Sequence, residues 1–158
     1  MSQATRTAVI ARLMADTTLA GMLATDPNTG NTPAIFMATR NTAPPVYPSL
    51  TYRISSANPD SKFMPGLPDQ GGDDVVNEYF EFEAWTQTPD SAPVESIAAR
   101  LDIAFQYRTL TGLTDGSNVF YAQRDIYLPD LYDKTLNAWF GLIRYHLRVQ
   151  TTGPAAPA

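Results

Sequence analysis

The chain of 158 residues contains no cysteine, a single histidine and 17% charged residues. The lack of cysteine excludes disulfides, thiol catalysis and thiolate metal sites. His146 is the only imidazole for a metal site or a serine–histidine relay. No apolar run approaches the ~18 residues of a membrane span, so no membrane partner is expected. The first residues lack the basic and apolar regions of a secretory signal, so we expect synthesis in a host cytoplasm.

The composition that is present favours one folded domain. Hydrophobic residues make up 44% of the chain, which is too much for a disordered protein and enough for a core. We expect a single domain over residues 1–150 and a flexible tail over 151–158. Acidic residues number 16 against 11 basic ones, giving a net charge of −5. This balance argues against a dedicated nucleic-acid binder, which would carry a basic face.

The first third of the chain predicts helices followed by strands. Apolar residues over 5–23 recur at helical spacing and indicate one helix or a broken pair, with Asp16 or Thr17 capping the second piece. Residues 34–39 form a short strand candidate. Residues 50–54 alternate between apolar and polar, which indicates a half-buried strand.

A long loop is expected over residues 56–74, which are rich in proline, glycine and aspartate. Phe63, Met64 and Leu67 lie in it without periodic context. They either dock onto a partner or fold back onto their own domain. The acidic residues of this loop lack the spacing of an EF-hand, so no metal site is predicted.

The second half of the chain predicts a strand, a helix and two further strands. Residues 75–86 alternate as a strand, and Ser91 is a plausible cap for the helix that follows. A strand is expected over 119–128, a turn over 129–134 and an unusually long strand over 135–150. Together these elements predict an α+β fold: a mostly antiparallel sheet of about four to five strands with an N-terminal helix and one central helix packed on it.

One face of the strand over 75–86 mixes aromatic residues with carboxylates. Alternation places Tyr79, Glu81, Glu83 and Trp85 together on this face, which is either solvated or in contact with a neighbouring subunit. Two carboxylates on one face are also found in glycosidases. Nothing in the sequence supplies a sugar-binding context, so this hypothesis is not favoured.

The last strand carries a basic face of Arg144, His146 and Arg148. These side chains suit either phosphate contact or salt bridges across a subunit interface, and the acidic chain favours the interface. His146 is the one near-neutral acid–base group. A histidine at a strand surface or interface is the favoured interpretation, so we predict no catalytic residue, no metal and no cofactor.

Four segments carry a resemblance to a known family: ARLMADTTLAGML, PPVYPSLTYRIS, EYFEFEAWTQTPDSAPVESIAARL and DLYDKTLNAWFGLIRYHL. Over residues 6–150 the chain resembles the tail completion proteins of long-tailed bacteriophages, also called tail terminator or tail-to-head joining proteins. In that family an aromatic strand ending near a tryptophan precedes a helix, and a later strand ends near a Tyr-Asp pair. Trp85 and the pair Tyr132-Asp133 stand at matching positions.

The resemblance implies a structural virion protein of the neck or tail rather than an enzyme. Such proteins form rings, usually of six subunits, which contact the tail tube protein and the connector or stopper protein of the head. Double-stranded DNA passes through the lumen without sequence-specific binding, and an acidic lumen would limit its adhesion. The loop over 56–74 is longer than is typical, and we expect it to reach the next ring.

Other hypotheses stay open from the sequence. They are a head-completion or tube-like ring component, an enzyme such as a carboxylate hydrolase, and an α+β domain that binds a small ligand or a peptide. The ring component is favoured because aromatic residues and long strands are abundant while catalytic groups are scarce.

Overall fold

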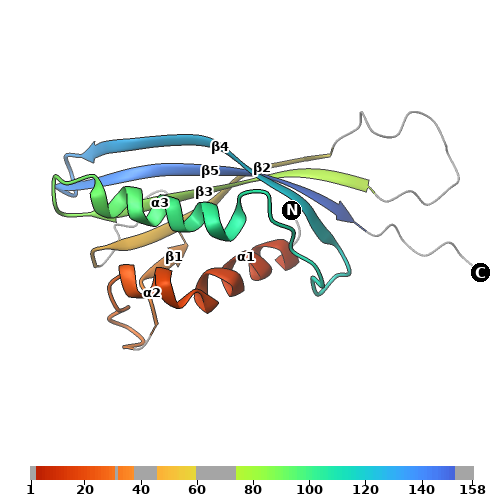
Figure 1. Cartoon of the computed structure of the whole chain (residues 1–158), viewed down its shortest axis with the longest axis horizontal. Coiled ribbons are helices and arrows are strands. Elements are labelled where there is room, and N and C mark those ends of the chain that lie inside the picture. Colours follow the sequence, from red (N-terminus) through yellow and green to blue (C-terminus); the bar gives the residue numbers. More distant parts are fainter. Residues whose placement is uncertain (1–2, 31, 38–45, 60–73, 152–158) are drawn as a thin grey trace, which may run out of the picture.

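One five-stranded sheet with helices on one of its faces makes up the fold (Figure 1). The computed structural model describes residues 3–30, 32–37, 46–59 and 74–151. The elements are α1 Gln3–Ala15, α2 Thr17–Met22, β1 Ile35–Met37, β2 Ser49–Pro59, β3 Asp74–Thr86, α3 Ala92–Phe105, β4 Asn118–Asp133 and β5 Ala138–Thr151. No helix in the described part of the chain is long and apolar enough to cross a membrane.

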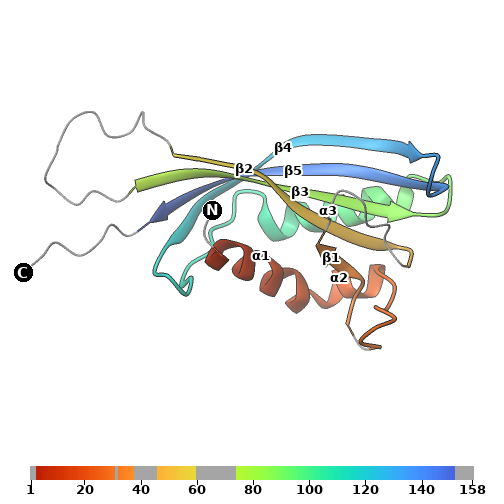
Figure 2. The same cartoon turned by 180° about the vertical axis from the view of Figure 1, so that it is seen from behind.

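The strand order is β1-β2-β3-β5-β4. Every neighbouring pair is antiparallel except β1 and β2, which run parallel over three residues. Seen from behind, the strands pass in front of α3, and α1 and α2 lie in the lower part of the view (Figure 2). The predicted α+β class and the mostly antiparallel sheet are confirmed.

The N-terminal segment is a pair of helices, the second of the two predicted alternatives. Asp16 separates α1 from α2 and caps α2, because its Oδ1 accepts hydrogen bonds from the amides of Thr18 and Leu19 at 3.0 Å each. Burial opposes ionisation of Asp16, but the hydrogen bond from Arg100, the two amides and the Arg100 charge outweigh it and lower its pKa below the ordinary 3.8. The Arg100 Nε lies 2.7 Å from Asp16 Oδ2, so this ion pair also fastens α3 to the N-terminal helices.

The core lies between α3 and the sheet. The predicted apolar face of α3 is buried in full: Val94, Ile97, Ala98, Leu101, Ala104 and Phe105. The ring of Phe82 on β3 lies 5.7 Å from that of Phe105 and 6.0 Å from that of Tyr145. Ser91 occupies the predicted cap position, but the first amide of α3 is bound by Asp90, whose Oδ1 accepts from Ala92 N at 3.0 Å.

Polar contacts fix α3 against the two last strands. Tyr145 donates its hydroxyl to Asp102 Oδ1 at 2.6 Å, and Arg124 Nη1 donates to Asp102 Oδ2 at 2.6 Å. Burial raises the pKa of Tyr145, and the adjacent Asp102 carboxylate raises it further, so this hydroxyl stays protonated. At Gly141 the helix comes so near that an added Cβ would lie 2.3 Å from Val94 Cγ1.

The predicted loop over 56–74 was wrong at both ends. β2 continues to Pro59 and β3 begins at Asp74, because residues 56–59 find backbone partners on β3 from Tyr79 to Val76. A register shift after Ile54 accommodates the extension. Phe63, Met64 and Leu67 lie outside the described residues.

The predicted turn over 129–134 was also wrong, since β4 runs through Pro129 to Asp133. β4 is an edge strand, where proline is tolerated, and a register shift between Leu128 and Leu131 takes up the irregularity. The turn therefore falls over 134–137, and the long strand begins at Ala138 rather than at 135. The predicted tail begins one residue too early, because Thr151 still pairs with Asp74.

Candidate interaction face

The face of the sheet turned away from the helices is called the open face here. Odd-numbered residues of β5 from Ile143 to Val149 are buried against the helices, so the even-numbered ones point to the open face. On it lie all the predicted interface residues that the structure describes: Tyr79, Glu81, Glu83, Trp85, Arg144, His146 and Arg148.

Glu81 is the centre of an ion-pair network on the open face. The strand register places Arg53 of β2 and Arg144 of β5 directly opposite Glu81 on its two sides. Arg53 Nε donates to Glu81 Oε2, and Arg144 Nη1 lies 3.8 Å from Glu81 Oε1. Arg144 Nε also donates to Asp125 Oδ2 at 2.8 Å. Asp125 is the residue of β4 that the register shift between Arg124 and Ile126 leaves without a partner on β5. Glu81 is only 7% exposed as a result.

Glu83 and Trp85 share a second polar contact. Thr51 Oγ1 donates to Glu83 Oε2 at 3.2 Å and accepts from Trp85 Nε1 at 3.1 Å. The indole of Trp85 stacks on Phe140, its cross-strand neighbour, with 4.5 Å between ring centroids. Arg53 also links the two glutamates, since its Nη2 lies 4.0 Å from Glu83 Oε1. Trp85 is buried rather than exposed.

His146 is packed as a strand-surface residue. Its ring stacks on Tyr79 with 4.8 Å between centroids and 11° between planes, and its Nε2 lies 2.8 Å from Asn77 Oδ1. The guanidinium carbon of Arg144 lies over the Tyr79 ring, 5.4 Å from its centroid, a cation–π distance. This geometry orders the imidazole between an aromatic ring and an amide.

The described residues offer little for a cofactor. Among them no group of three histidine, aspartate or glutamate side chains is placed to hold a metal ion. An open hollow with about 170 Å³ of empty space, part of it bulk solvent, lies beside the start of α3. It is lined by Pro89, Asp90, Ser91, Val94, Asp130, Trp139 and Phe140.

Sequence reasoning missed the partners of the predicted residues. Arg53, Thr51 and Asp125 complete the contacts of the open face, yet only the strand register identifies them. The alternation over 50–54 did place Thr51 and Arg53 on one face, which is the signal that could have suggested them.

The fold defined here is a five-stranded α+β sheet with all its described helices on one face. A chain in the virion of a native gene transfer agent (GTA) particle is similar to it, with a TM-score of 0.63. The two chains are 16% identical, and the match covers 91% of this chain and 92% of that one. At this identity the likeness establishes a shared fold. No known family model and no curated protein matches the chain.

Proposed function

We propose that this chain is a structural virion protein that forms a ring, of six copies, at the neck of a tailed phage-like particle. The ring ends the tail tube and joins the tail to the head. The observation that carries this proposal is the fold shared over nearly the whole chain with a protein of a GTA virion. The sequence resemblance to tail completion proteins points to the same kind of component.

The surface chemistry supports a role in assembly. A closed ring needs two different contact surfaces on each subunit, because every copy binds one neighbour on each side. Large apolar side chains are exposed on several elements of the described chain, which suits contact with other proteins. They are Met14, Met37, Ile103, Tyr107, Phe120, Leu128 and Tyr132.

The proposed partners are further copies of the chain, the tail tube protein and the connector or stopper protein of the head. DNA passes through the lumen without sequence-specific binding. The net charge of −5 supports this passage, since an acidic wall repels the phosphate backbone. A ring whose lumen is lined by basic side chains would contradict this part of the proposal.

Negative-stain electron microscopy of the purified chain, alone and mixed with phage tail tubes, tests the proposal. We expect rings with a central hole, or caps at one end of each tube. Phe82→Ala, which removes a core side chain, is a control for the fold: a loss of rings in it reports lost stability rather than a lost contact. A folded wild-type chain that forms no rings and leaves both tube ends bare would contradict the proposal.

A second candidate is another ring component of the neck or tail, such as a head-completion or tube-like protein. The observation behind it is that the matched chain is described only as part of the virion of a GTA particle, which does not distinguish one virion component from another. Localising the chain in intact particles with a specific antibody separates the two. Label where the tail meets the head favours the terminator, and label along the tail favours a tube-like component.

A further inference from the structure

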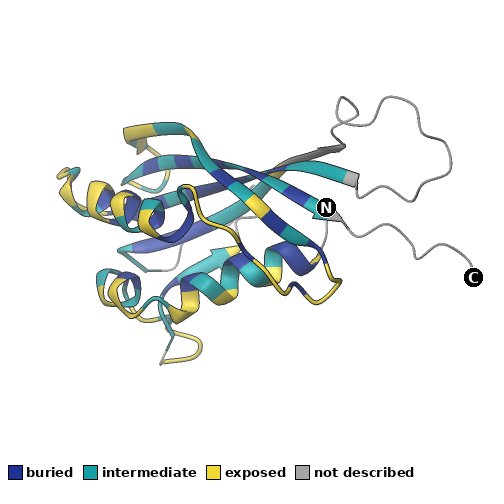
Figure 3. Cartoon of the chain, turned by 45° about the vertical axis from the view of Figure 1, so that its right-hand side comes forward, coloured by how far each residue is buried: buried dark blue, intermediate teal, exposed yellow. Residues whose placement is uncertain are grey.

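Two surfaces of opposite charge lie at the two ends of α3. The helix has 14 residues, so its ends are about 20 Å apart at 1.5 Å per residue. Exposed residues gather over the end of β4 and along the segment between α3 and β4 (Figure 3). The first region lies near the start of α3, and the second continues from its end.

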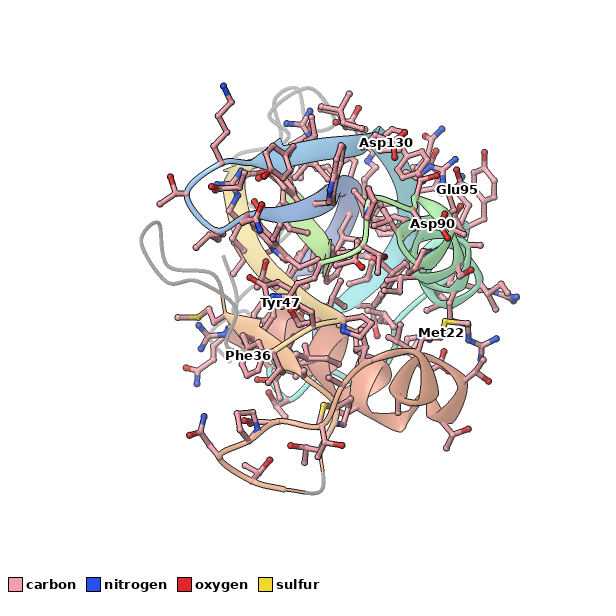
Figure 4. The ribbon with its side chains drawn as sticks, turned by 90° about the vertical axis from the view of Figure 1, so that its left-hand side faces the viewer. Met22, Phe36, Tyr47, Asp90, Glu95 and Asp130 are labelled. Carbon is pink, nitrogen blue, oxygen red and sulfur yellow. The ribbon has the colours of Figure 1, made fainter. Side chains whose placement is uncertain are left out.

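The acidic surface consists of Asp90, Glu95 and Asp130. Figure 4 shows the three side chains on the same side of the molecule, where α3 begins. Asp90 and Asp130 line the same hollow. Burial raises the pKa of Tyr127, and the negative charges of Glu95 and Asp130 raise it further, so both carboxylates act on this hydroxyl.

These carboxylates have no positive partner within the described part of the chain. Asp90 accepts from an amide and Glu95 from a hydroxyl, and no arginine or lysine of the described residues forms an ion pair with any of the three.

The basic surface consists of Arg12, Tyr107 and Arg108. Arg12 Nη1 donates to the carbonyl oxygen of Thr109 at 3.5 Å, which brings α1 beside the segment that follows α3. Neither arginine forms an ion pair with a carboxylate of the described residues. Their charges are thus available to an outside partner.

Tyr107 is an unusual residue for its position. It follows the C-cap Gln106 and has a φ of 56°, in the left-handed region where helices commonly end in glycine. A bulky side chain there is conformationally costly, and this one is 68% exposed. Exposed tyrosines are favoured at protein interfaces, where one ring supplies a large contact area. Within its own chain the ring makes a tilted contact with Tyr121, 6.4 Å between centroids, and most of its surface stays open to an aromatic contact with a partner.

We propose that the acidic surface of one copy binds the basic surface of the next copy, and that this contact builds the ring. The inference rests on the proposed function and names the surfaces that carry it out. Opposite charges without internal partners complement one another across such a contact. Two copies of the same surface repel, so the contact is head-to-tail, as a closed ring requires.

Charge-reversed variants test the contact by sedimentation velocity over a range of concentrations. Glu95→Lys/Asp130→Asn cancels the net negative charge of the acidic surface, because the new lysine offsets the remaining Asp90, and asparagine tolerates the φ of 61° at position 130. Arg12→Glu/Arg108→Glu reverses the other surface. Each variant alone should need at least about 10-fold more protein to associate, because the attraction between the two surfaces is then lost or turned into repulsion. An equimolar mixture should recover assembly, since each variant presents what the other lacks.

Two further variants separate the contact from the fold. Arg6→Glu is the matched control: it reverses a charge on the same helix, but Arg6 lies beside Met37 of β1, outside both surfaces. It should assemble like the wild type. Tyr107→Gly relieves the left-handed strain, so it should be at least as stable as the wild type and yet associate more weakly.

The proposed contact is overturned if either charge-reversed variant associates like the wild type, or if their mixture does not recover assembly. The contact is also overturned if the wild type caps tail tubes but its copies never associate with one another, on tubes or in solution. In that case the proposed role at the neck stands without the contact. Rings that form with equal strength in all variants refute the named surfaces while supporting the ring itself.

Discussion

The two faces of the sheet are built from alternate residues of the same strands, yet they differ in chemistry. The helix-covered face presents Phe80, Phe82 and Tyr145, all at most 1% exposed. The open face presents the Arg53–Glu81–Arg144 network and stacked cross-strand pairs. Neighbouring residues of one strand therefore belong in turn to an apolar core and to a charged surface.

This difference indicates where the free energy of folding comes from. Burial of large apolar side chains contributes about 1.5–3 kcal/mol each, whereas ion pairs near the surface contribute about 0–1 kcal/mol. The helix-covered face should dominate stability. The open face should set the polar character of the surface and hold the strands in register.

The largest expected effect comes from Phe82→Ala, which should lower the free energy of unfolding by about 3–5 kcal/mol. The phenyl ring contacts Phe105 and Tyr145 in the buried core. Urea denaturation of this variant is compared with that of Tyr79→Ala, an aromatic-to-alanine change three residues earlier on the open face, for which we expect about 1 kcal/mol. Equal losses at the two positions would remove the distinction between the faces.

The next effect is expected from Gly141→Ala, which should cost about 1–3 kcal/mol by overpacking the contact between α3 and β5. The new methyl group would lie 2.3 Å from Val94 Cγ1, on a stiff β-branched side chain. In the presence of Val94→Ala the destabilisation caused by Gly141→Ala should shrink. Thermal unfolding of the wild type, the two single variants and the double variant measures this difference. A cost that is unchanged by Val94→Ala would show that the close approach is not its cause.

A smaller effect is expected from Glu81→Gln, at about 1 kcal/mol, even though the glutamate itself is buried. Both arginine partners are partly exposed, with side-chain exposures of 42% for Arg53 and 29% for Arg144, so water can solvate them. The difference between wild type and variant should fall at high salt. A loss as large as that of Phe82→Ala would place a major part of the stability on the open face.

The smallest effect is expected from Asp16→Asn, at about 0.5–1 kcal/mol at neutral pH. Asparagine still caps α2, so the variant removes mainly the Arg100 ion pair. Because the folded pKa of Asp16 lies below its unfolded value, its contribution is present above about pH 4 and is lost as the pH falls through the folded pKa. Urea denaturation of both proteins at neutral and acidic pH should show the two curves converging in acid, and a constant gap would contradict the assigned ion pair.

The sequence predicted the elements that depend on local patterns. The alternation over 75–86 and the apolar spacing from Val94 to Phe105 each match an observed element, β3 and α3. Each signal comes from a single periodic segment that has one buried face. The same alternation also placed Tyr79, Glu81, Glu83 and Trp85 on a common face.

Features that depend on pairing between distant segments were not predictable. Pro129 reads as a turn residue, and only its place on an edge strand beside β5 lets it extend β4. Residues 56–59 are strand because β3 supplies their partners. The link from Arg53 to Glu81 needs the register of two strands, which no local pattern gives. The opposite charges at the ends of α3 emerge only when α1 and β4 are placed beside it.

The most direct test of the central claim is native mass spectrometry of the purified wild-type chain over a range of concentrations. The proposed function predicts a discrete closed species of six 17.3 kDa chains, which dissociates as salt is raised because the contact is electrostatic. A chain that stays monomeric both alone and in the presence of tail tubes, or that forms only a salt-resistant dimer, would contradict the account.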